Sequence, residues 1–470
     1  MISLDYKTLA QEVQGELMNG KFGAAHFRGV AIDSRAVAER QLFIAIRGTR
    51  DDGHNYIRNI MNIPGVGLLV RRGYEALPEI YNDIPVVAVE DTHRAMIELA
   101  RGYRRRLKCF VIAVTGSNGK TTTKEFVYAM IASRFKSSYR SQGNLNNLYG
   151  LPLAIFAMPS DTKYAVFELG ISLPKEMTGL AAIAEPDLAL ITNVGPTHLE
   201  TLGTVENVAA AKFELVDFMS DDKPVVLNAD SEPVMQAASK RKRKFITYGI
   251  KNQADFMARP AGISEDGFPL VEIERHLIKV PLFGEHQAYN LLAGYAVSRV
   301  LGIEISPADL DRIDYRFAPY RGEIESINGV TIISDCYNAN PVSMKSGLRS
   351  FHHYMSHPTL AKRRSVVIVG DMLELGEKSA QYHTEIGRLL GTLKFDLALA
   401  VGPQSREIVS GAIEAGFNKE NIIHFEKTEQ AGDFLIDNVR RGDIVYLKAS
   451  RGIGLEKLIT LLKGSAFRQN

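Results

Sequence analysis

The chain has 470 residues, 45% of them hydrophobic, which is enough for about three domains with cores of their own. A formal net charge of +2 is small for this length, so the overall charge favours neither nucleic acid nor an anionic membrane as the main partner. The two cysteines stand in apolar stretches, a usage that fits a reducing cytoplasm and gives neither a disulfide framework nor a metal set.

The first residues have neither the basic end nor the apolar core of a signal peptide, and no stretch approaches the roughly 20 apolar residues of a membrane span. We therefore predict a cytoplasmic protein without membrane insertion. Residues 1–106 predict a small α/β domain, with a helix over 6–17 and strands over 29–33 and 41–45. A helix over 91–106 should close it, ending in a solvated basic cluster: Arg104, Arg105 and Arg106.

Residues 107–315 alternate strand and helix patterns, which predicts a P-loop-type domain around a mostly parallel sheet. Its strands are expected at 110–115, 164–169, 188–193, 224–228 and 244–248. Residues 254–282 predict an antiparallel excursion, followed by a helix over 285–301.

A loop over 316–322 is interpreted as a hinge to a third domain, residues 316–470. Alternation resumes there, with strands expected at 331–334, 365–369, 397–401, 422–425 and 444–447. This pattern predicts a doubly wound, Rossmann-like α/β domain, but no G-x-G-x-x-G follows its first strand, so a dinucleotide site is not expected.

The first strand of the middle domain runs into a glycine-bearing loop and then a helix, the layout of a nucleotide phosphate site. Lys120 could reach the outer phosphates, and the Thr121 hydroxyl could bind Mg²⁺. The usual G-x-x-x-x-G-K-[ST] spacing would need glycine at Val114, so a tight turn with a solvated lysine stays an alternative. The nucleotide-binding loop is predicted to comprise Thr115, Gly116, Ser117, Asn118, Gly119, Lys120, Thr121 and Thr122.

Two further polar residues lie at the ends of predicted strands of the same sheet or just after them. Glu168 offers a hard oxygen ligand for Mg²⁺, and His198 could touch a second metal or orient a water. In parallel sheets ligands gather at the carboxyl ends of strands, so both could converge on the loop. Taken singly, each could also be an ordinary structural residue.

These stretches resemble the successive signatures of the Mur ligases, the ATP-dependent enzymes that build the peptidoglycan stem peptide. Residues 115–122, 167–170 and 191–200 carry the family resemblance. Residues 142–147, 335–341, 370–376 and 448–452 are similar in particular to the branch that adds D-alanyl-D-alanine. Cys336 and Ala449 depart from a serine and a glycine that are common there, but neither side chain has an evident chemical role.

The resemblance implies an ADP-forming ligation: ATP phosphorylates a peptide carboxylate, and an amine displaces phosphate from the acyl phosphate. It implies catalytic roles for Lys120, Glu168, His198 and Lys212. Thr121 and Glu168 would bind one Mg²⁺ and His198 a second, with Lys212 as a carbamate supplying oxygens to the second ion. An ammonium cannot ligate Mg²⁺, so partial burial would have to lower the pKa of Lys212 first.

The resemblance also implies the partners UDP-N-acetylmuramoyl-tripeptide and D-alanyl-D-alanine. From the charge no nucleic-acid partner is expected, and a monomer is predicted. Further nucleotide contacts would come from Asn290, Arg321, Asp335 and Asn338. Substrate contacts are predicted for Ser34, Arg35, Asn146 and Asn147. Three alternatives stay open: a sibling that adds a single amino acid, a nucleotide-binding scaffold without turnover, and a generic nucleotide-hydrolysing P-loop protein.

Overall fold

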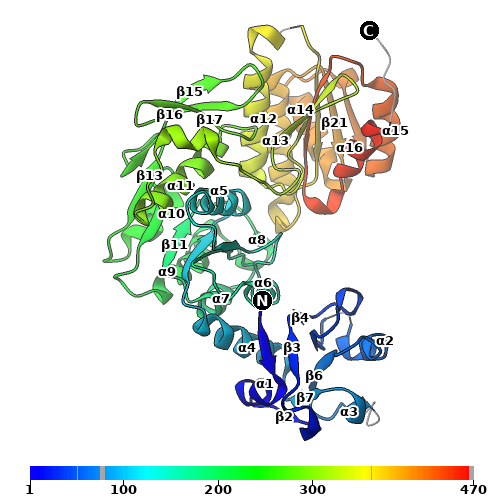
Figure 1. Cartoon of the computed structure of the whole chain (residues 1–470). Helices are drawn as coiled ribbons and strands as arrows, with labels where there is room; N and C mark the ends of the chain where they lie inside the picture. The colour runs from blue at the N-terminus through cyan, green and yellow to red at the C-terminus, as the bar shows by residue number, and fades with distance from the viewer. Residues whose placement is uncertain (50, 75–79, 361, 465–470) are drawn as a thin grey trace. The chain divides into compact units, whose positions relative to one another are not determined.

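The protein is described by a computed structural model over residues 1–49, 51–74, 80–360 and 362–464 (Figure 1). The chain forms two compact units. The first comprises Met1–Thr115, Arg134–Ala189 and Glu214–Lys223; the second comprises Gly116–Ser133, Leu190–Phe213 and Pro224–Asn470. The domain boundaries at 106/107 and 315/316 stay a prediction.

The amino-terminal part of the first unit holds two sheets. β1 (Ser3–Asp5) pairs antiparallel with β3 (His26–Arg28). A five-stranded sheet has the order β2-β7-β6-β5-β4, parallel except for β2. Its strands are β2 (Glu16–Leu17), β4 (Val30–Ala31), β5 (Leu42–Ile44), β6 (Gly67–Arg71) and β7 (Val86–Val89). The helices here are α1 (Tyr6–Glu12), α2 (Ile57–Ile60), α3 (Ile80–Asp83) and α4 (Thr92–Arg106).

The helix predicted over 6–17 is wrong in its second half. α1 ends at Glu12, and the chain turns to pair β2 with β7. At Gly15 the backbone lies so close to β7 that an added Cβ would be 2.8 Å from the side chains of Val87 and Val89. Strand pairing, a tertiary effect, has overridden the local helical pattern.

The helix over 91–106 is confirmed, and Asp91 caps it by accepting a hydrogen bond from Arg94 N (3.0 Å). The solvated basic end is correct for Arg105 and Arg106 and wrong for Arg104. Arg104 is buried and donates to the carbonyls of Ala184 (2.8 Å), Leu107 and others. Its guanidinium thus hydrogen-bonds backbone carbonyls from two parts of the chain.

A seven-stranded sheet has the order β14-β13-β12-β11-β8-β10-β9. In the first unit β8 and β9 flank β10 in parallel; in the second, β12, β13 and β14 are parallel. The strands are β8 (Phe110–Thr115), β9 (Ser138–Arg140), β10 (Tyr164–Glu168), β11 (Leu188–Ile191), β12 (Val225–Asn228), β13 (Ile246–Gly249) and β14 (Phe256–Met257). All five predicted strands are present, which confirms the mostly parallel sheet; β9 was not predicted.

Seven helices belong to this stretch of chain: α5 (Lys120–Ala132), α6 (Gly150–Ala157), α7 (Glu176–Ala184), α8 (Leu199–Leu202), α9 (Val205–Phe218), α10 (Glu232–Ser239) and α11 (Gln287–Val300). The antiparallel excursion is confirmed as a three-stranded sheet, β15 (Arg259–Ile263), β16 (Pro269–Ile273) and β17 (His276–Lys279). One strand within the predicted range 254–282 departs from the prediction: β14 pairs with β13 in the parallel sheet.

The third predicted domain contains a six-stranded sheet of order β18-β19-β23-β20-β21-β22, parallel except for β18. Its strands are β18 (Glu323–Ile327), β19 (Val330–Ser334), β20 (Ser365–Gly370), β21 (Leu397–Val401), β22 (Ile422–Phe425) and β23 (Ile444–Lys448). Its helices are α12 (Pro341–Met355), α13 (Ser379–Leu393), α14 (Arg406–Glu414), α15 (Thr428–Asn438) and α16 (Glu456–Lys463).

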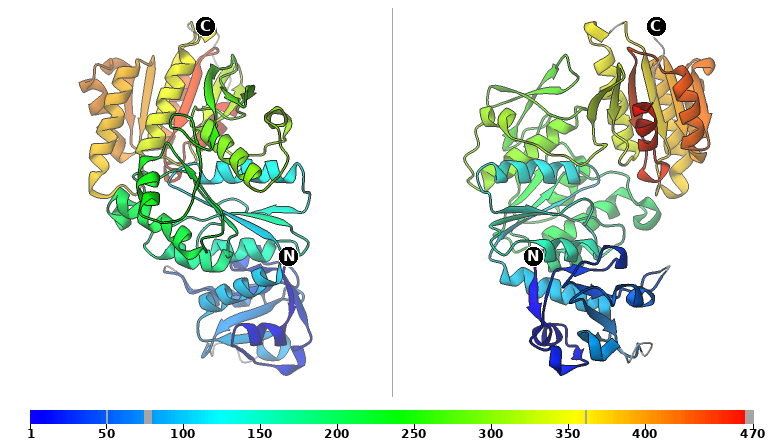
Figure 2. Two further views of the ribbon diagram at one scale, coloured as in Figure 1. Left: turned by 90° about the vertical axis from the view of Figure 1, so that its left-hand side faces the viewer. Right: turned by 45° about the vertical axis from the view of Figure 1, so that its right-hand side comes forward.

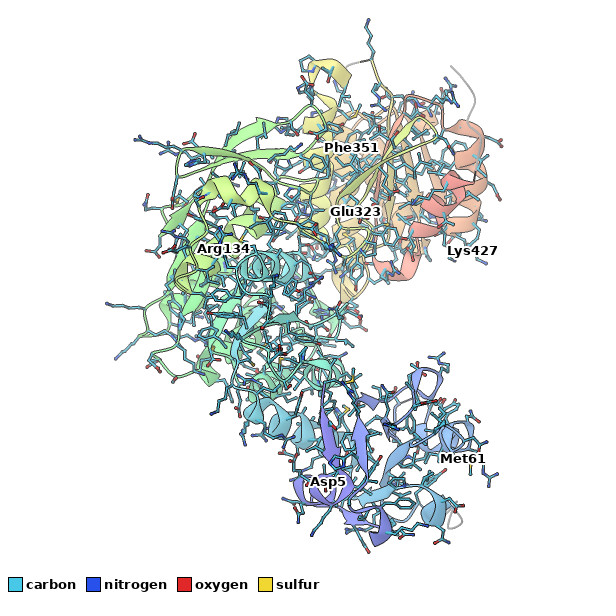
Figure 3. All side chains as sticks on the ribbon, viewed as in Figure 1. Asp5, Met61, Arg134, Glu323, Phe351 and Lys427 are labelled. Atoms are coloured by element: carbon cyan, nitrogen blue, oxygen red, sulfur yellow. The ribbon has the colours of Figure 1, made fainter. Side chains whose placement is uncertain are left out.

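Both faces of this sheet are covered by helices, as predicted for a doubly wound domain (Figure 2). Residues of β20 alternate between two cores: Val367 and Val369 pack with α12–α14, and Val366 and Ile368 pack with α15 and α16. Phe351, labelled in Figure 3, stacks on other rings of the first core. Such buried packing makes the sheet a rigid base for the loops that follow its strands.

Candidate functional site

The loop between β8 and α5 needs glycine at two positions. Gly116 and Gly119 both have positive φ, 149° and 77°. An added Cβ would lie 1.9 Å from Thr192 Oγ1 at Gly116 and 2.4 Å from Asn290 Oδ1 at Gly119. Glycine therefore lets the chain turn sharply into α5, whose first N–H groups and helix dipole favour an anion.

Hydrogen bonds hold this loop to the turn after β11. Ser117 N donates to Asn193 O (2.8 Å), and Asn118 N donates to Asn193 Oδ1 (3.0 Å). In return, Thr192 Oγ1 donates to Asn118 O (2.6 Å), and Gly195 N donates to Ser117 Oγ (3.0 Å). The loop is thus preorganised by the segment that leads to His198.

Two lysines, Lys120 and Lys212, interact electrostatically at this site. Lys120 Nζ lies over its own loop and donates to Gly116 O (2.8 Å) and Ser117 O (3.4 Å). Lys212, on α9, is 1% exposed. Burial, with a smaller effect from the charge of Lys120, lowers the pKa of the Lys212 ammonium well below its usual value. Burial therefore favours a neutral amine at Lys212, which is the form that the predicted carbamate requires.

Asn290 supports the loop from α11. Its Oδ1 accepts from Thr123 Oγ1 (3.0 Å), and its Nδ2 donates to Gln287 Oε1 (2.7 Å). Asn290 is buried and, as described above, lies directly behind Gly119. Its amide therefore links α11 to α5; the nucleotide contact predicted for it stays a prediction.

Two residues that follow strands of the third predicted domain contact this region within the second unit. Asn340 caps α12 by accepting from Ser343 N (3.0 Å), and its Nδ2 donates to Asn118 Oδ1. Glu374 accepts from His198 Nδ1 (2.6 Å). This hydrogen bond holds the pKa of the Glu374 carboxyl below its usual value. Neither Asn340 nor Glu374 was singled out in the sequence, although both lie in the motifs that carry the resemblance.

The other nucleotide candidates gather at the carboxyl ends of β19 and β23. Asp335 Oδ2 accepts from Lys448 Nζ (2.7 Å) and Tyr446 OH (3.1 Å), and all three side chains are buried. The Arg321 guanidinium carbon lies 3.8 Å from the centroid of the Tyr337 ring, a cation–π contact. The sequence analysis did not single out Tyr446, and it included Lys448 and Tyr337 only within motifs of the resemblance. Their contacts were not predicted, because a pairing of distant residues leaves no local pattern.

Asn338, the last of these candidates, uses its side chain locally, because Oδ1 accepts from Ala339 N (2.9 Å). Its carbonyl receives a longer hydrogen bond from Lys448 Nζ (3.5 Å). Asn338 therefore contacts the Asp335–Lys448 pair through its backbone carbonyl and not through its side chain. Residues 335–340 join β19 to α12 and so connect this pair to the Asn340 cap.

In the first unit, Glu168 is buried at the end of β10 and accepts from Asn146 Nδ2 (2.7 Å). Asn147 Oδ1 instead accepts from Gly150 N (2.8 Å), a helix-start contact at α6. Arg35 is exposed and forms an ion pair with Asp33 (2.8 Å), which lowers the pKa of the Asp33 carboxyl to about 2. Ser34 begins the short 3₁₀ turn that contains Arg35.

Among the described residues, no three or more His, Cys, Asp or Glu side chains form a group that could hold a metal ion. Mg²⁺ commonly takes only one or two carboxylates, completing its shell with phosphate oxygens and water. The predicted donors suit that mode: a buried carboxylate, Glu168; a hydroxyl in the first turn of α5, Thr121; and an imidazole, His198, whose Nδ1 is already bonded.

Comparison with protein-family models gives three consecutive matches. Residues 26–104 match the Mur ligase family, catalytic domain; residues 114–298 match the Mur ligase middle domain; and residues 317–451 match the Mur ligase, glutamate ligase domain.

Relatives are similar over nearly the whole length. The UDP-N-acetylmuramoyl-tripeptide--D-alanyl-D-alanine ligase of Bacillus subtilis is 33% identical, with 98% of each chain covered, and the Escherichia coli protein of the same name is 28% identical, with 98% of this chain and 99% of that one covered. A crystal structure of MurF from Acinetobacter baumannii has a TM-score of 0.84 at 26% identity, covering 98% of this chain and 99% of that chain. MurF ligase from Thermotoga maritima in complex with ADP has a TM-score of 0.78 at 27% identity, covering 93% and 97%.

Proposed function

The chain belongs to the Mur ligase family, and we propose that it joins the tripeptide carboxylate of UDP-N-acetylmuramoyl-tripeptide to D-alanyl-D-alanine with conversion of ATP to ADP and phosphate. The observation that carries this proposal is the sharply turned glycine loop with Lys120 over it, together with the buried Lys212, whose pKa the charge of Lys120 helps to lower. Full-length similarity to ligases of that name supports the choice of substrates.

The loop binds the ATP phosphates through its N–H groups and Lys120 (residues 115–122). The ADP complex named for the Thermotoga maritima relative supports a nucleotide here. Asn290, Arg321, Asp335 and Asn338 complete the nucleotide site. Phosphoryl transfer depends mainly on positioning and neutralisation of charge, so a rigid loop with a fixed cation suits the reaction.

Two Mg²⁺ ions supply charge neutralisation on the phosphates when bound. Thr121 and Glu168 would hold one ion, and His198 with a carbamate of Lys212 the other. Lys212 meets the chemical condition for carbamate formation, because burial favours the neutral amine that reacts with CO₂. Ser34, Arg35, Asn146 and Asn147 are assigned to the nucleotide-linked peptide.

The protein would act as a cytoplasmic monomer. Within the part of the chain that the structure describes, no helix is long and apolar enough to cross a membrane. A sibling activity with a single amino acid is the second candidate, but the names of the relatives favour the dipeptide. The full set of ligase residues argues against a scaffold that binds nucleotide without turnover.

Phosphate release tests this function. The purified protein is given Mg²⁺-ATP and UDP-N-acetylmuramoyl-tripeptide with D-alanyl-D-alanine, meso-diaminopimelate or lysine, and Lys120→Ala is the control. We expect release that requires both substrates, prefers the dipeptide and is lost in the variant. Turnover with a single amino acid would indicate the sibling activity, and tripeptide binding without release would indicate a scaffold.

A further inference from the structure

A hydrogen bond between His198 and Glu374 joins two chain segments that are far apart in sequence, and both residues adopt an uncommon backbone conformation. Their φ angles are 52° and 63°, in the left-handed region that non-glycine residues seldom occupy. Such conformations persist only where the surroundings hold them, and they gather at functional sites. The pair therefore needs an explanation beyond a surface contact.

Hydrogen bonds to the backbone of His198 and of the preceding turn fix the position of its Cα atom. His198 O accepts from Leu202 N (2.9 Å), from Thr201 N (3.2 Å) and from the Thr201 hydroxyl (3.1 Å), so His198 starts α8. The preceding turn is tied to the phosphate-binding loop through Ser117 and Gly195. The Cα position of His198 is thus set by the same network that shapes the nucleotide loop.

The loop that presents Glu374 is anchored just before it. Met372 N donates to His383 Nε2 (3.0 Å), and Leu373 N donates to Ser450 Oγ (3.0 Å). Just after it, the backbone approaches α8, since an added Cβ at Gly376 would lie 3.4 Å from the Cα of Glu200. Glu374 is therefore held toward α8 by its own domain as well as by His198.

The contact selects one form of the imidazole. Glu374 Oε2 lies 2.6 Å from His198 Nδ1, and an ionised carboxylate can only accept, so Nδ1 carries the hydrogen. In the neutral ring Nε2 then has a free lone pair. A carboxylate in this position is one of the usual partners of a histidine that binds a metal, because it fixes both the tautomer and the ring orientation.

We propose that Glu374 is a positioning residue for His198: it holds the ring in the Nδ1–H tautomer and directs Nε2 toward the Mg²⁺-ATP site. This inference rests on the proposed function for the identity of the ligand. Its consequence is that a residue following β20 of the third predicted domain tunes a metal ligand that follows β11. In this proposal Glu374 acts through His198.

The test combines a direct and a functional readout in Glu374→Ala and Glu374→Gln, with Glu377→Gln, an exposed acid three residues on, as the matched control. Ring ¹⁵N chemical shifts of labelled histidine report the tautomer, and His198→Asn identifies the His198 signal. The Mg²⁺ dependence of ADP binding, followed by calorimetry, reports the metal requirement without turnover.

We expect the Nδ1–H tautomer of His198 in the wild-type protein and its loss in Glu374→Ala. The Mg²⁺ concentration for half-maximal ADP binding should rise by about 10- to 100-fold in that variant, less in Glu374→Gln, and not in Glu377→Gln. An unchanged tautomer or an unchanged Mg²⁺ requirement in folded Glu374→Ala overturns the proposal. Absence of ligase turnover in the wild-type protein would refute the proposed function but leave both of these readouts measurable.

Discussion

Replacing Gly119 by alanine should damage the phosphate-binding loop in two separable ways. Alanine at φ 77° pays for a left-handed conformation, about 1–2 kcal/mol. Its Cβ would also lie 2.4 Å from Asn290 Oδ1, so the amide must move and loosen its hydrogen bond with Thr123, a net contribution of about 1 kcal/mol. We therefore expect a loss of roughly 2–3 kcal/mol in the free energy of unfolding.

Gly73 provides the matched control, because it has the same φ of 77° and nothing within 4 Å of an added Cβ. Gly73→Ala should cost only the conformational part, about 1–2 kcal/mol. Urea unfolding compares the two variants, and calorimetry measures ADP binding, which should weaken about tenfold or more in Gly119→Ala alone, since 1.4 kcal/mol is a factor of ten. Equal stability losses and unchanged ADP affinity would refute the assigned contact between Gly119 and Asn290.

Three further predictions concern Lys212, Arg104 and Asp335. In Lys212→Met the free energy of unfolding should depend less on pH than in the wild-type protein. Between the lowered pKa of folded Lys212 and about pH 10.4, the unfolded chain binds a proton that folded Lys212 does not, so wild-type stability should rise with pH in that window. The same pH dependence of both proteins in denaturation from about pH 7 to 10 would show that folded Lys212 is charged there and would contradict this reasoning. Arg104→Met should lower the free energy of unfolding by about 2–4 kcal/mol, because the carbonyls that Arg104 bonds lose this donor. Arg105→Ala, at an exposed ion pair, should lower it by at most about 1 kcal/mol. Equal shifts of the melting temperature in the two variants would contradict the burial of Arg104. Asp335→Asn should lower the free energy of unfolding by about 3–5 kcal/mol, because it leaves the Lys448 ammonium buried without its partner. Adding Lys448→Met should recover part of that loss. If chemical denaturation shows that the losses of the two substitutions add, Asp335 and Lys448 are not coupled.

Patterns within one segment predicted most of the elements. β8 and β21 have the expected bounds, because each is a short apolar run bounded by polar residues or turns. The strand-to-helix layout predicted the loop between β8 and α5, whereas the role of Lys212, inside α9, came only from the family resemblance and stays a prediction.

Features that depend on distant partners were not predictable in this way. α1 stops early because β2 pairs with β7, and Arg104 is buried because carbonyls from another part of the chain accept its hydrogen bonds. The Glu374–His198 and Lys448–Asp335 pairs join residues 176 and 113 positions apart. A charged residue in a loop has the same local pattern whether it is solvated or paired, so only the folded chain distinguishes these cases.

The most direct test of the central claim is an isotope-transfer measurement. The terminal carboxylate of the UDP-N-acetylmuramoyl-tripeptide is labelled with ¹⁸O, and mass spectrometry follows the phosphate released with Mg²⁺-ATP and D-alanyl-D-alanine. If the carboxylate attacks the γ-phosphorus and the amine then displaces phosphate, each released phosphate carries one carboxylate oxygen. We predict one ¹⁸O per phosphate together with the pentapeptide product; product formed with unlabelled phosphate would contradict the acyl-phosphate route, and unlabelled phosphate without product would contradict the ligase assignment.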